Sequence, residues 1–516
     1  MDAISLSIFA NRIDAICGEM GATLQKSAFS PNIRDRLDYS CAIFDAGGEL
    51  CAQAAHIPVH LGSMAFAMKD VVSDINWCAG DMIVLNDPYR GGTHLPDVTL
   101  IAPLFIAGSL AGFVANRAHH ADIGSETPGS MPLSSSLSEE GLIIEPTLLV
   151  KDDQLDALYF ASLMKNMRNK QESSGDFIAQ IAANRRGLTR LTALIEKMGF
   201  SDYLSSLELL NAYAATLAKK SLAGIKDGEY SFKDMLDDDG QGQVDIIIEV
   251  LVKFAQGNIT VDFTGTAQQV KGNINCPLSV TAAAVYYVFR CLMPAQTPAC
   301  AGGFKNIKIL APEKSIVNAS YPAAVAAGNV ETSTRIVDVV LGALAKVIPD
   351  RIPAASHGSM NNLAMGSVGD ANSAAWDYYE TIGGGMGASS VSSGLDAVQT
   401  HMTNTLNTPI EALEMKYPLR INRYQIRTGA SGKGKQAGGE GLIREYEFLA
   451  PAQVTILSER REHSPWGLFS GGEAAKTGLN QLNDKPLAAK QAFRVQRGDV
   501  VCIQTAGGGG YGRAKG

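Results

Sequence analysis

In NDPYRGGTHLPDVTLIAPLF (residues 86–105), a polar turn that contains HLPD leads directly into an apolar run. A short apolar run bounded by turn residues predicts a β-strand. A second strand is predicted for GFVANRA (residues 112–118), and the string HHAD follows it directly. Two neighbouring strands of this kind bring HLPD and HHAD to one edge of a sheet. The sequence therefore predicts a sheet with histidine and aspartate gathered at that edge.

Five residues of these strings can bind a divalent metal: His94, Asp97, His119, His120 and Asp122. Two imidazoles and a carboxylate suit Zn²⁺, Mn²⁺ or Fe²⁺, and three or four protein ligands leave a position open for substrate or water. Adjacent residues of an extended strand point to opposite faces, so only one of His119 and His120 is expected to bind the metal. The alternative is that these side chains only form hydrogen bonds in turns and a buried network.

Further carboxylates stand beside small residues and turns. Asp38 in RDRLDYS directly precedes a predicted strand, where it is either a further metal ligand or a cap between helix and strand. Glu139 and Glu140 in SLSEEGL, and Glu331 in AAGNVETS, are close to glycines that allow a ligand to approach the backbone. Glu331 also fits the acidic first turn of a helix.

The composition places the chain among folded globular proteins. It has 516 residues, of which 46% are hydrophobic, 19% are charged and 52 are glycine. These values exclude a disordered or collagen-like chain and favour two to four domains. The net charge of −8 gives no basic surface for phosphates, so nucleic acid is not an expected partner.

The cysteines and the N-terminus indicate the compartment. The eight cysteines form no C-x-x-C pair and no zinc-ribbon spacing, so they are predicted to be buried free thiols of a reducing compartment. The N-terminus lacks the basic and apolar regions of a signal peptide, and no stretch reaches about 18 apolar residues. We therefore expect a cytoplasmic protein that does not interact with membranes.

The expected fold class is mixed α/β (α+β) and multi-domain, with three regions. Residues 1–223 combine a helix over residues 4–27, short strands around the metal ligands, and a helical segment over residues 176–223 that is broken near Gly199. This helical segment is predicted to hold two or three helices.

The other two regions differ from the first in composition. Residues 224–354 are predicted to hold strands joined by turns at DDDG and AQGN, followed by two helices, VTAAAVYYVFRCLM and ETSTRIVDVVLGALAKVI. Residues 355–516 are rich in Gly, Asn, Ser and Thr and are predicted to be loop-rich and β-rich. No period of 20 to 50 residues recurs, so a solenoid or propeller is not expected.

Two glycine-rich strings resemble nucleotide-binding motifs but lack features that those motifs require. In GASGKGKQ (residues 429–436), Gln436 stands where a P-loop needs a hydroxyl for Mg²⁺, and turn and strand residues follow in place of a helix. GGGGYG (residues 507–512) also lacks a following helix and is interpreted as turn glycine. The sequence therefore predicts that this chain does not bind ATP.

Many long strings of this chain resemble the hydantoinase B/oxoprolinase family, which includes B-type subunits of ATP-dependent hydantoinases, 5-oxoprolinases and the related acetone and acetophenone carboxylases. The resemblance runs from end to end and includes RLDYSCAIFD, NDPYRGGTHLPDVT, RAHHADIGS, SEEGLII, GNVETSTRIVDVVLGAL, YYETIGGGMGA and SERREHSPWG.

The resemblance implies a metal site and a partner. It assigns His94, Asp97 and His119 as ligands of a divalent metal, with Asp38 as a fourth. It also implies that ATP is used by a separate A-type subunit with an actin-like kinase fold, because this chain has no such segment fused to it. The expected assembly is a hetero-oligomer.

The leading hypothesis is a B-type component of an ATP-dependent cyclic amidohydrolase, which hydrolyses a hydantoin, 5-oxoproline or similar lactam after the partner has phosphorylated it. Glu140 or His120 is expected to be the general base, and Asp122 is a further catalytic candidate. One alternative is a component of an acetone- or acetophenone-type carboxylase. The other is a non-catalytic scaffold whose histidine cluster is structural.

Overall fold

The N-terminal part of the chain folds into a seven-stranded antiparallel sheet with the order β2-β1-β5-β4-β3-β6-β7. The computed structural model describes residues 2–369, 375–469 and 471–514. The strands of this sheet are β1 (Tyr39–Asp45), β2 (Leu50–Ala55), β3 (Met82–Leu85), β4 (Asp97–Ile106), β5 (Ser109–His119), β6 (Thr147–Lys151) and β7 (Gln154–Leu155). The strands predicted around residues 98–105 and 112–118 are β4 and β5, which pair with each other as expected.

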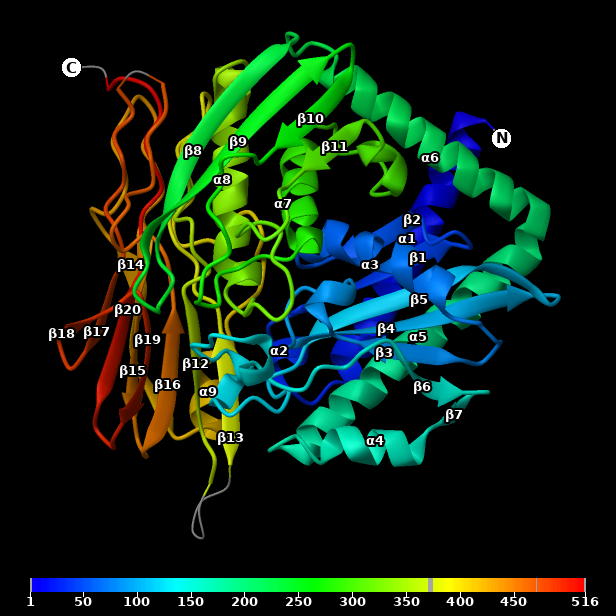
Figure 1. Cartoon of the computed structure of the whole chain (residues 1–516), viewed down its shortest axis with the longest axis horizontal. Coiled ribbons are helices and arrows are strands. Elements are labelled where there is room, and N and C mark those ends of the chain that lie inside the picture. Colours follow the sequence, from blue (N-terminus) through cyan, green and yellow to red (C-terminus); the bar gives the residue numbers. More distant parts are fainter. Residues whose placement is uncertain (1, 370–374, 470, 515–516) are drawn as a thin grey trace.

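Helices cover both faces of this sheet, so its strands are buried on both sides. In β1, Cys41 and Ile43 belong to the cluster that contains α1 (Ala3–Ser27) and α5 (Lys170–Met198). Ala42 and Phe44 alternate with them along β1 and point to the other face. There they belong to a second hydrophobic cluster, which contains residues of α3 (His60–Asp74). The sheet is therefore the middle layer of three, as Figure 1 shows.

The predicted helix over residues 4–27 is confirmed as α1, and the helical segment over 176–223 is formed by α5 and α6 (Phe200–Leu222). Gly199 separates α5 from α6 with a φ of 92°, a backbone conformation that favours glycine. Two shorter helices, α2 (Pro31–Arg34) and α4 (Ala157–Met164), flank the sheet. Single short turns of helix are η1 (Pro88–Arg90), η2 (Pro128–Ser130), η3 (Leu137–Glu139), η4 (Ala301–Phe304) and η6 (Pro349–Arg351).

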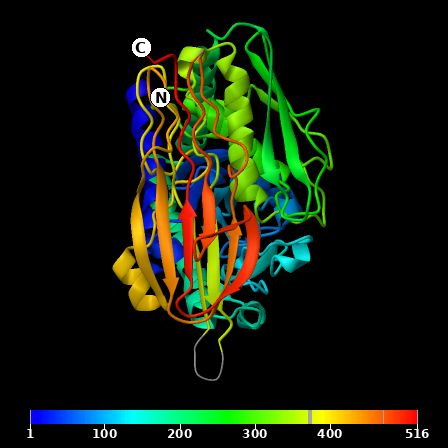
Figure 2. The same ribbon diagram turned by 90° about the vertical axis from the view of Figure 1, so that its left-hand side faces the viewer.

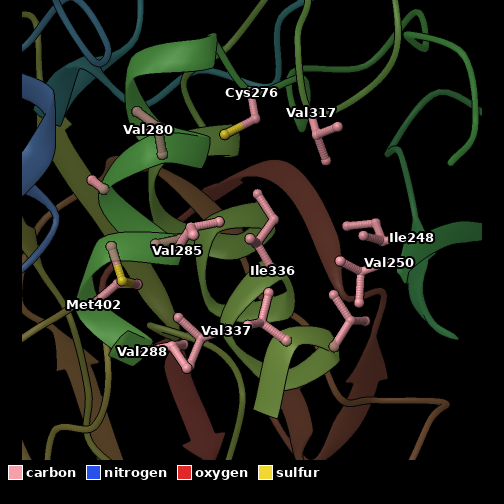
Figure 3. Packing of buried hydrophobic residues seen from close by; sticks show 14 of the residues in the cluster. Ile248, Val250, Cys276, Val280, Val285, Val288, Val317, Ile336, Val337 and Met402 are labelled. Atoms are coloured by element: carbon pink, nitrogen blue, oxygen red, sulfur yellow. The ribbon is translucent and has the colours of Figure 1, made fainter. Parts of the chain in front are cut away.

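The second region starts with the predicted strands. They are β8 (Gly228–Asp238), β9 (Val244–Ala255) and β10 (Asn258–Asp262), which together with β11 (Ile307–Leu310) form a sheet of order β11-β10-β9-β8. The turns at DDDG and AQGN join β8 to β9 and β9 to β10, as expected. This sheet packs on α7 (Leu278–Cys291) and α8 (Ser333–Ala345), and Figure 3 shows the aliphatic side chains between them.

The second predicted helix of this region begins differently from the expectation. Residues 328–332 form a π-helical turn, η5 (Gly328–Thr332), and α8 continues from Ser333. Glu331 lies in the first turn of this helical segment, as expected. It is fully buried and accepts hydrogen bonds from the backbone N–H of Met360 and from Asn362 Nδ2. π-turns of this kind occur frequently at functional sites.

The third region is β-rich and loop-rich, as predicted, and Figure 2 shows its strands side by side. Strands β12 (Asn362–Ser367), β13 (Trp376–Glu380), β16 (Ala452–Leu457) and β19 (Lys490–Val495) form a sheet of order β13-β12-β16-β19. Strands β14 (Leu419–Arg427), β15 (Gly441–Phe448), β17 (Leu479–Leu482), β18 (Lys485–Leu487) and β20 (Val500–Gln504) form the other, of order β14-β15-β20-β17-β18. A short helix, α9 (Ile410–Lys416), precedes β14.

The two glycine-rich strings that imitate nucleotide motifs pack against each other. Residues 429–436 lie between β14 and β15 with no helix after them. The backbone N–H of Gly432 donates to Gly508 O, and a Cβ atom on Gly438 would lie 1.8 Å from Gly508 O. The glycines at 507–512 therefore serve close contact between backbones, rather than only the turns that the sequence suggested.

Two further expectations concern the cysteines and the membrane. All eight cysteines are free, and six are buried, but Cys78 and Cys291 are exposed, contrary to the expectation of buried thiols. Within the described residues, no helix has the length and apolar character that crossing a bilayer requires.

Candidate metal centre

The pairing of β4 with β5 brings an aspartate and a histidine together from distant positions. Asp97 begins β4 and His119 ends β5, and the register of the two strands places them directly opposite each other. His94 lies in the turn that leads into β4. The ligand atoms of these three residues lie within 4.8 Å of one another, and all three side chains are buried.

The two imidazoles converge on one carboxylate oxygen. His94 Nε2 and His119 Nδ1 each lie 3.3 Å from Asp97 Oδ1. His94 Nδ1 lies 3.1 Å from the carbonyl oxygen of Ala326, which can only accept a hydrogen bond. In the neutral ring, this contact fixes the proton on Nδ1 and leaves the lone pair of Nε2 directed at the cluster, the tautomer that a metal requires.

The second oxygen of Asp97 is held by other side chains. Thr93 Oγ1 donates to Asp97 Oδ2 at 2.5 Å, and Asn329 Nδ2 donates to it at 3.4 Å. His60 Nε2 lies 3.5 Å from the same oxygen. These contacts fix the orientation of the carboxylate, so that Oδ1 faces the two imidazoles.

The electrostatics of the cluster keep it in a form that can bind a cation. Burial alone would raise the pKa of Asp97, but His94, His119 and His60 outweigh it and hold that pKa well below its usual range. Burial lowers the pKa of His119. Burial also acts to lower the pKa of His94, but the neighbouring Asp97 outweighs it and raises that pKa. Asp97 is therefore ionised, and His119 is neutral, at neutral pH. Asp97 favours the protonated form of His94, whose Nε2 proton a bound cation would displace.

The donor set fits a divalent metal. His94 Nε2 and His119 Nε2 are buried and have no hydrogen-bond partner, and neither has Asn329 Oδ1 beside them. Buried polar groups of this kind are rarely left unpaired. A cavity of about 20 Å³ adjoins the cluster, lined in part by Asp38, Tyr379 and Thr405, and this volume holds about one water molecule or ion. Two imidazoles and a carboxylate suit Zn²⁺, Mn²⁺ or Fe²⁺.

Asp38 lines the same cavity but lies outside the cluster of three ligands. Its carbonyl oxygen accepts a hydrogen bond from the backbone N–H of His119 at 3.0 Å, and its carboxylate lies 4.0 Å from Arg36 Nη2. The structure therefore places Asp38 on the cavity beside the centre, but its carboxylate is not part of the cluster of three ligands.

His120 and Asp122 lie away from the cluster. His120 Nε2 bonds Gln180 Oε1 at 2.9 Å, and its ring packs against Phe177 of α5. Asp122 Oδ1 accepts from the backbone N–H of Gly124, while Oδ2 accepts from the backbone N–H groups of Arg168 and Asn169, just before α5. His120 thus attaches the end of β5 to α5 itself, and Asp122 attaches it to the residues just before α5.

Glu140 is fully buried close to the centre, although it does not line the cavity. Its Oε1 accepts hydrogen bonds from Ser134 Oγ and from the backbone N–H groups of Val325 and Ala326. Its Oε2 has no partner. Burial raises the pKa of Glu140 to about 7. The carboxylate therefore holds the same segment whose carbonyl group binds His94.

A profile of the Hydantoinase B/oxoprolinase family matches residues 2–514 of this sequence. The chain belongs to the Hydantoinase B/oxoprolinase family. It is 41% identical to an uncharacterised protein of Methanocaldococcus jannaschii over 99% of this chain and 91% of that protein. It is 33% identical to a Pseudomonas sp. protein named as the putative B-type subunit of a D-/L-hydantoinase, over 99% of this chain and 90% of that protein.

Longer relatives exist as well. The chain is 39% identical to 5-oxoprolinase 1 of Arabidopsis thaliana over 99% of its own length, but it covers only 42% of that protein. The chain thus spans about two fifths of the 5-oxoprolinase it matches.

Two solved structures share the fold. The ATP-dependent caprolactamase from Pseudomonas jessenii superposes with a TM-score of 0.92 at 26% identity, with 100% of this chain and 91% of that chain covered. A nucleotide-free acetone carboxylase superposes with a TM-score of 0.88 at 17% identity, with 99% and 76% covered. The second likeness shows the fold alone.

Tyr379, like Thr93, lies at this centre and was not predicted from the sequence. Its ring stacks on His119 with 4.7 Å between ring centroids and 12° between ring planes. The string YYETIGGGMGA contains it, but the two adjacent tyrosines are identical in type. Only the pairing of β13 with β12 decides which of them faces His119.

Proposed function

We propose that this chain hydrolyses a cyclic amide, such as a hydantoin, 5-oxoproline or a similar lactam, after a partner subunit has activated it with ATP. The observation that carries the proposal is the buried cluster of His94, Asp97 and His119 beside a cavity. The names of the 5-oxoprolinase and of the hydantoinase relative support the substrate class, and the caprolactamase likeness supports lactam chemistry.

The chemistry of the substrate explains why ATP is needed. Amide resonance makes a lactam carbonyl a poor electrophile, and phosphorylation of its oxygen creates an imidate-like species with a good leaving group. A divalent metal held by His94, Asp97 and His119 would supply a Lewis acid next to the reacting carbon. We infer that ATP is bound by the partner, because neither glycine-rich string of this chain continues into a helix.

The protein side chains hold and orient this site. Thr93 and Asn329 fix Asp97, and Ala326 fixes the tautomer of His94. We propose that Glu140 is a positioning residue, because it binds the backbone N–H of Ala326 and so holds the carbonyl group that His94 contacts. This role replaces the general base expected for Glu140 or His120, since neither residue lines the cavity.

We propose that Asp38 accepts the proton of the attacking water. Among the described residues that line the cavity, Asp38 and Asp97 carry the carboxylates, and Asp97 already contacts both imidazoles. A general base must lie within hydrogen-bond reach of the water that it activates. The cavity of about 20 Å³ has room for this water molecule.

The test is an assay of the complex between this chain and its A-type partner, with a panel of lactams and ATP. We expect ring opening that requires both proteins, ATP and a divalent metal. Ring opening that is independent of ATP would contradict the proposal. Bicarbonate-dependent ATP turnover with a ketone, in place of lactam hydrolysis, would favour the carboxylase reaction instead.

Variants of the same complex separate the roles of the residues. His119→Ala should lose both the metal and activity, whereas His120→Ala should keep the metal, because its ring lies against Phe177. Asp38→Asn should keep the metal and lower kcat by about 100-fold or more, the usual contribution of a general base. Metal loss in Asp38→Asn would assign this residue as a ligand instead, and metal loss in His120→Ala but not His119→Ala would identify the other imidazole.

A further inference from the structure

Tyr379 lies against the metal centre from a part of the chain far away in sequence. It belongs to β13, where it pairs with Ala364 of β12, and its side chain is about 1% exposed. Its ring is stacked on the imidazole of His119, with 4.7 Å between the ring centroids and 12° between their planes. His119 is therefore confined by Asp97 on the neighbouring strand and by Tyr379 against its face.

The ring of Tyr379 is itself held in place by hydrogen bonds and by Arg36. Its hydroxyl donates to Asn362 Oδ1 at 2.7 Å. Asn362 Nδ2 in turn donates to Glu331 Oε1 at 2.7 Å, on the π-turn that also carries Asn329. The guanidinium carbon of Arg36 lies 5.0 Å from the centroid of the Tyr379 ring, and Arg36 Nη1 donates to Tyr379 O at 2.6 Å.

These contacts form a buried network of side chains that ends at His119, the proposed metal ligand. All its members have an exposed fraction of 3% or less: Arg36, His119, Glu331, Asn362 and Tyr379. Side chains that are buried and hydrogen-bonded in this way cannot rotate without leaving a polar atom unpaired. Loss of a residue that orients a metal-binding histidine typically lowers metal affinity or activity by about 10- to 100-fold.

We propose that Tyr379, anchored by Asn362, is a positioning residue for His119, so that the third region of the chain completes a metal centre built on the N-terminal sheet. The inference rests on the metal site of the proposed function and deepens it. The imidazole of His119 has no hydrogen-bond partner on Nε2. Its direction is set by Asp97, by the stacked ring of Tyr379 and by the ring of His94, whose centroid lies 5.1 Å away.

The experiment is a titration of the metal-free protein with Co²⁺, followed by the visible absorption of the bound ion. Tyr379→Phe keeps the ring but removes its anchor on Asn362. We expect the dissociation constant for Co²⁺ to rise about 10- to 100-fold and the absorption bands to shift, because the imidazole direction is no longer fixed. Tyr379→Leu, which also removes the stacked ring, should weaken binding at least as much.

Tyr378→Phe is the matched control. Tyr378 is the preceding residue of β13, is equally buried, and donates its hydroxyl to Glu380 Oε2 at 2.9 Å. It points to the other face of the sheet, so its loss should lower stability about as much without changing Co²⁺ affinity or absorption. Equal Co²⁺ affinities and spectra in Tyr379→Phe, Tyr378→Phe and the unmodified chain would overturn the inference. Failure of the unmodified chain to bind Co²⁺ would instead contradict the metal site of the proposed function.

Discussion

Asp97 shows how a buried charge is retained in this protein. Its carboxylate is about 1% exposed, yet its pKa is held well below the usual range by the surrounding histidines. An isolated buried carboxylate would take up a proton. Here Thr93, Asn329 and the imidazoles supply hydrogen bonds or opposite charge, so that the ionised form persists where a cation can bind.

Glu331 is the opposite case, a buried carboxyl group that favours its neutral form. Burial, followed by the nearby charge of Glu459, raises its pKa to about 8, while Ser359, Lys490 and the N–H of Met360 act in the other direction. A carboxyl group whose pKa is raised by folding stabilises the folded state at low pH, and this contribution is lost as pH rises from about 4.5 toward 8.

Glu331→Gln should therefore change how stability depends on pH. Glutamine keeps an oxygen acceptor for Asn362 but does not ionise, so the variant should gain stability relative to the unmodified chain as pH rises from 5 to 8. We expect a relative gain of at least ~1 kcal/mol over this range, since each unit of pKa shift corresponds to ~1.4 kcal/mol. Urea unfolding at pH 5, 6.5 and 8 measures it, with the exposed Glu411→Gln as control. A difference in stability that does not vary with pH would contradict the raised pKa.

At the scale of elements, the π-turn η5 is the structure that connects the second region to the metal centre. Asn329 of this turn donates a hydrogen bond to Asp97. Glu331, two residues further along the turn, accepts one from Asn362. The turn can make both contacts because it passes very close to another backbone: a Cβ atom on Gly328 would lie 1.8 Å from Asn275 O.

Gly328→Ala should therefore move this turn. The added methyl group cannot be accommodated by a side-chain rotation, because the atom it meets belongs to the backbone. We expect a loss of about 1–3 kcal/mol in stability, typical of overpacking, together with weaker Co²⁺ binding. Calorimetry and the Co²⁺ titration measure the two effects.

Gly18→Ala is the matched control for this substitution. A Cβ atom on Gly18, an exposed position inside α1, meets no atom within 4 Å. Alanine should stabilise the helix there by up to ~1 kcal/mol without any effect on Co²⁺. Unchanged stability and Co²⁺ affinity in Gly328→Ala would show that the turn tolerates displacement.

At the scale of the whole molecule, the site draws on all three sequence regions. The ligands come from the N-terminal sheet, Asn329 comes from the π-turn, and Tyr379 comes from β13. The largest buried cluster likewise extends from Ile57 to Leu457. The site is therefore complete only when all three regions are packed together.

This chain alone should not bind ATP, yet it should form a stable complex with an A-type subunit. The glycine-rich strings are used for contacts between backbones. In the proposed mechanism, an activated lactam would have to reach the site without exposure to bulk water. Calorimetric titration of the isolated chain with Mg-ATP tests the first half of this prediction. Size-exclusion chromatography of the co-expressed proteins tests the second half. Micromolar ATP binding by this chain alone, or its elution as a lone monomer beside the partner, would contradict the two-subunit mechanism.

Local sequence determined most of the elements of this protein. The apolar period of residues 4–27, the break at Gly199, the turns DDDG and AQGN, and the strands on either side of HLPD and HHAD were all predictable. The reason is that helix periodicity, turn chemistry and strand alternation depend on neighbours within a few residues. Strand alternation predicted only that one of His119 and His120 binds the metal. The choice of His119, together with His94 and Asp97, came from the family resemblance.

Only the tertiary structure decided what surrounds the ligands. Asp122 and His120 carry the right chemistry, but the packing of α5 directs them to Arg168 and Gln180. Tyr379 enters the centre from 260 residues beyond His119 because β13 pairs with β12, and Glu331 is buried because its helix begins with a π-turn. These contacts depend on the register between strands and on the packing of segments that are distant in sequence, and no local pattern encodes either.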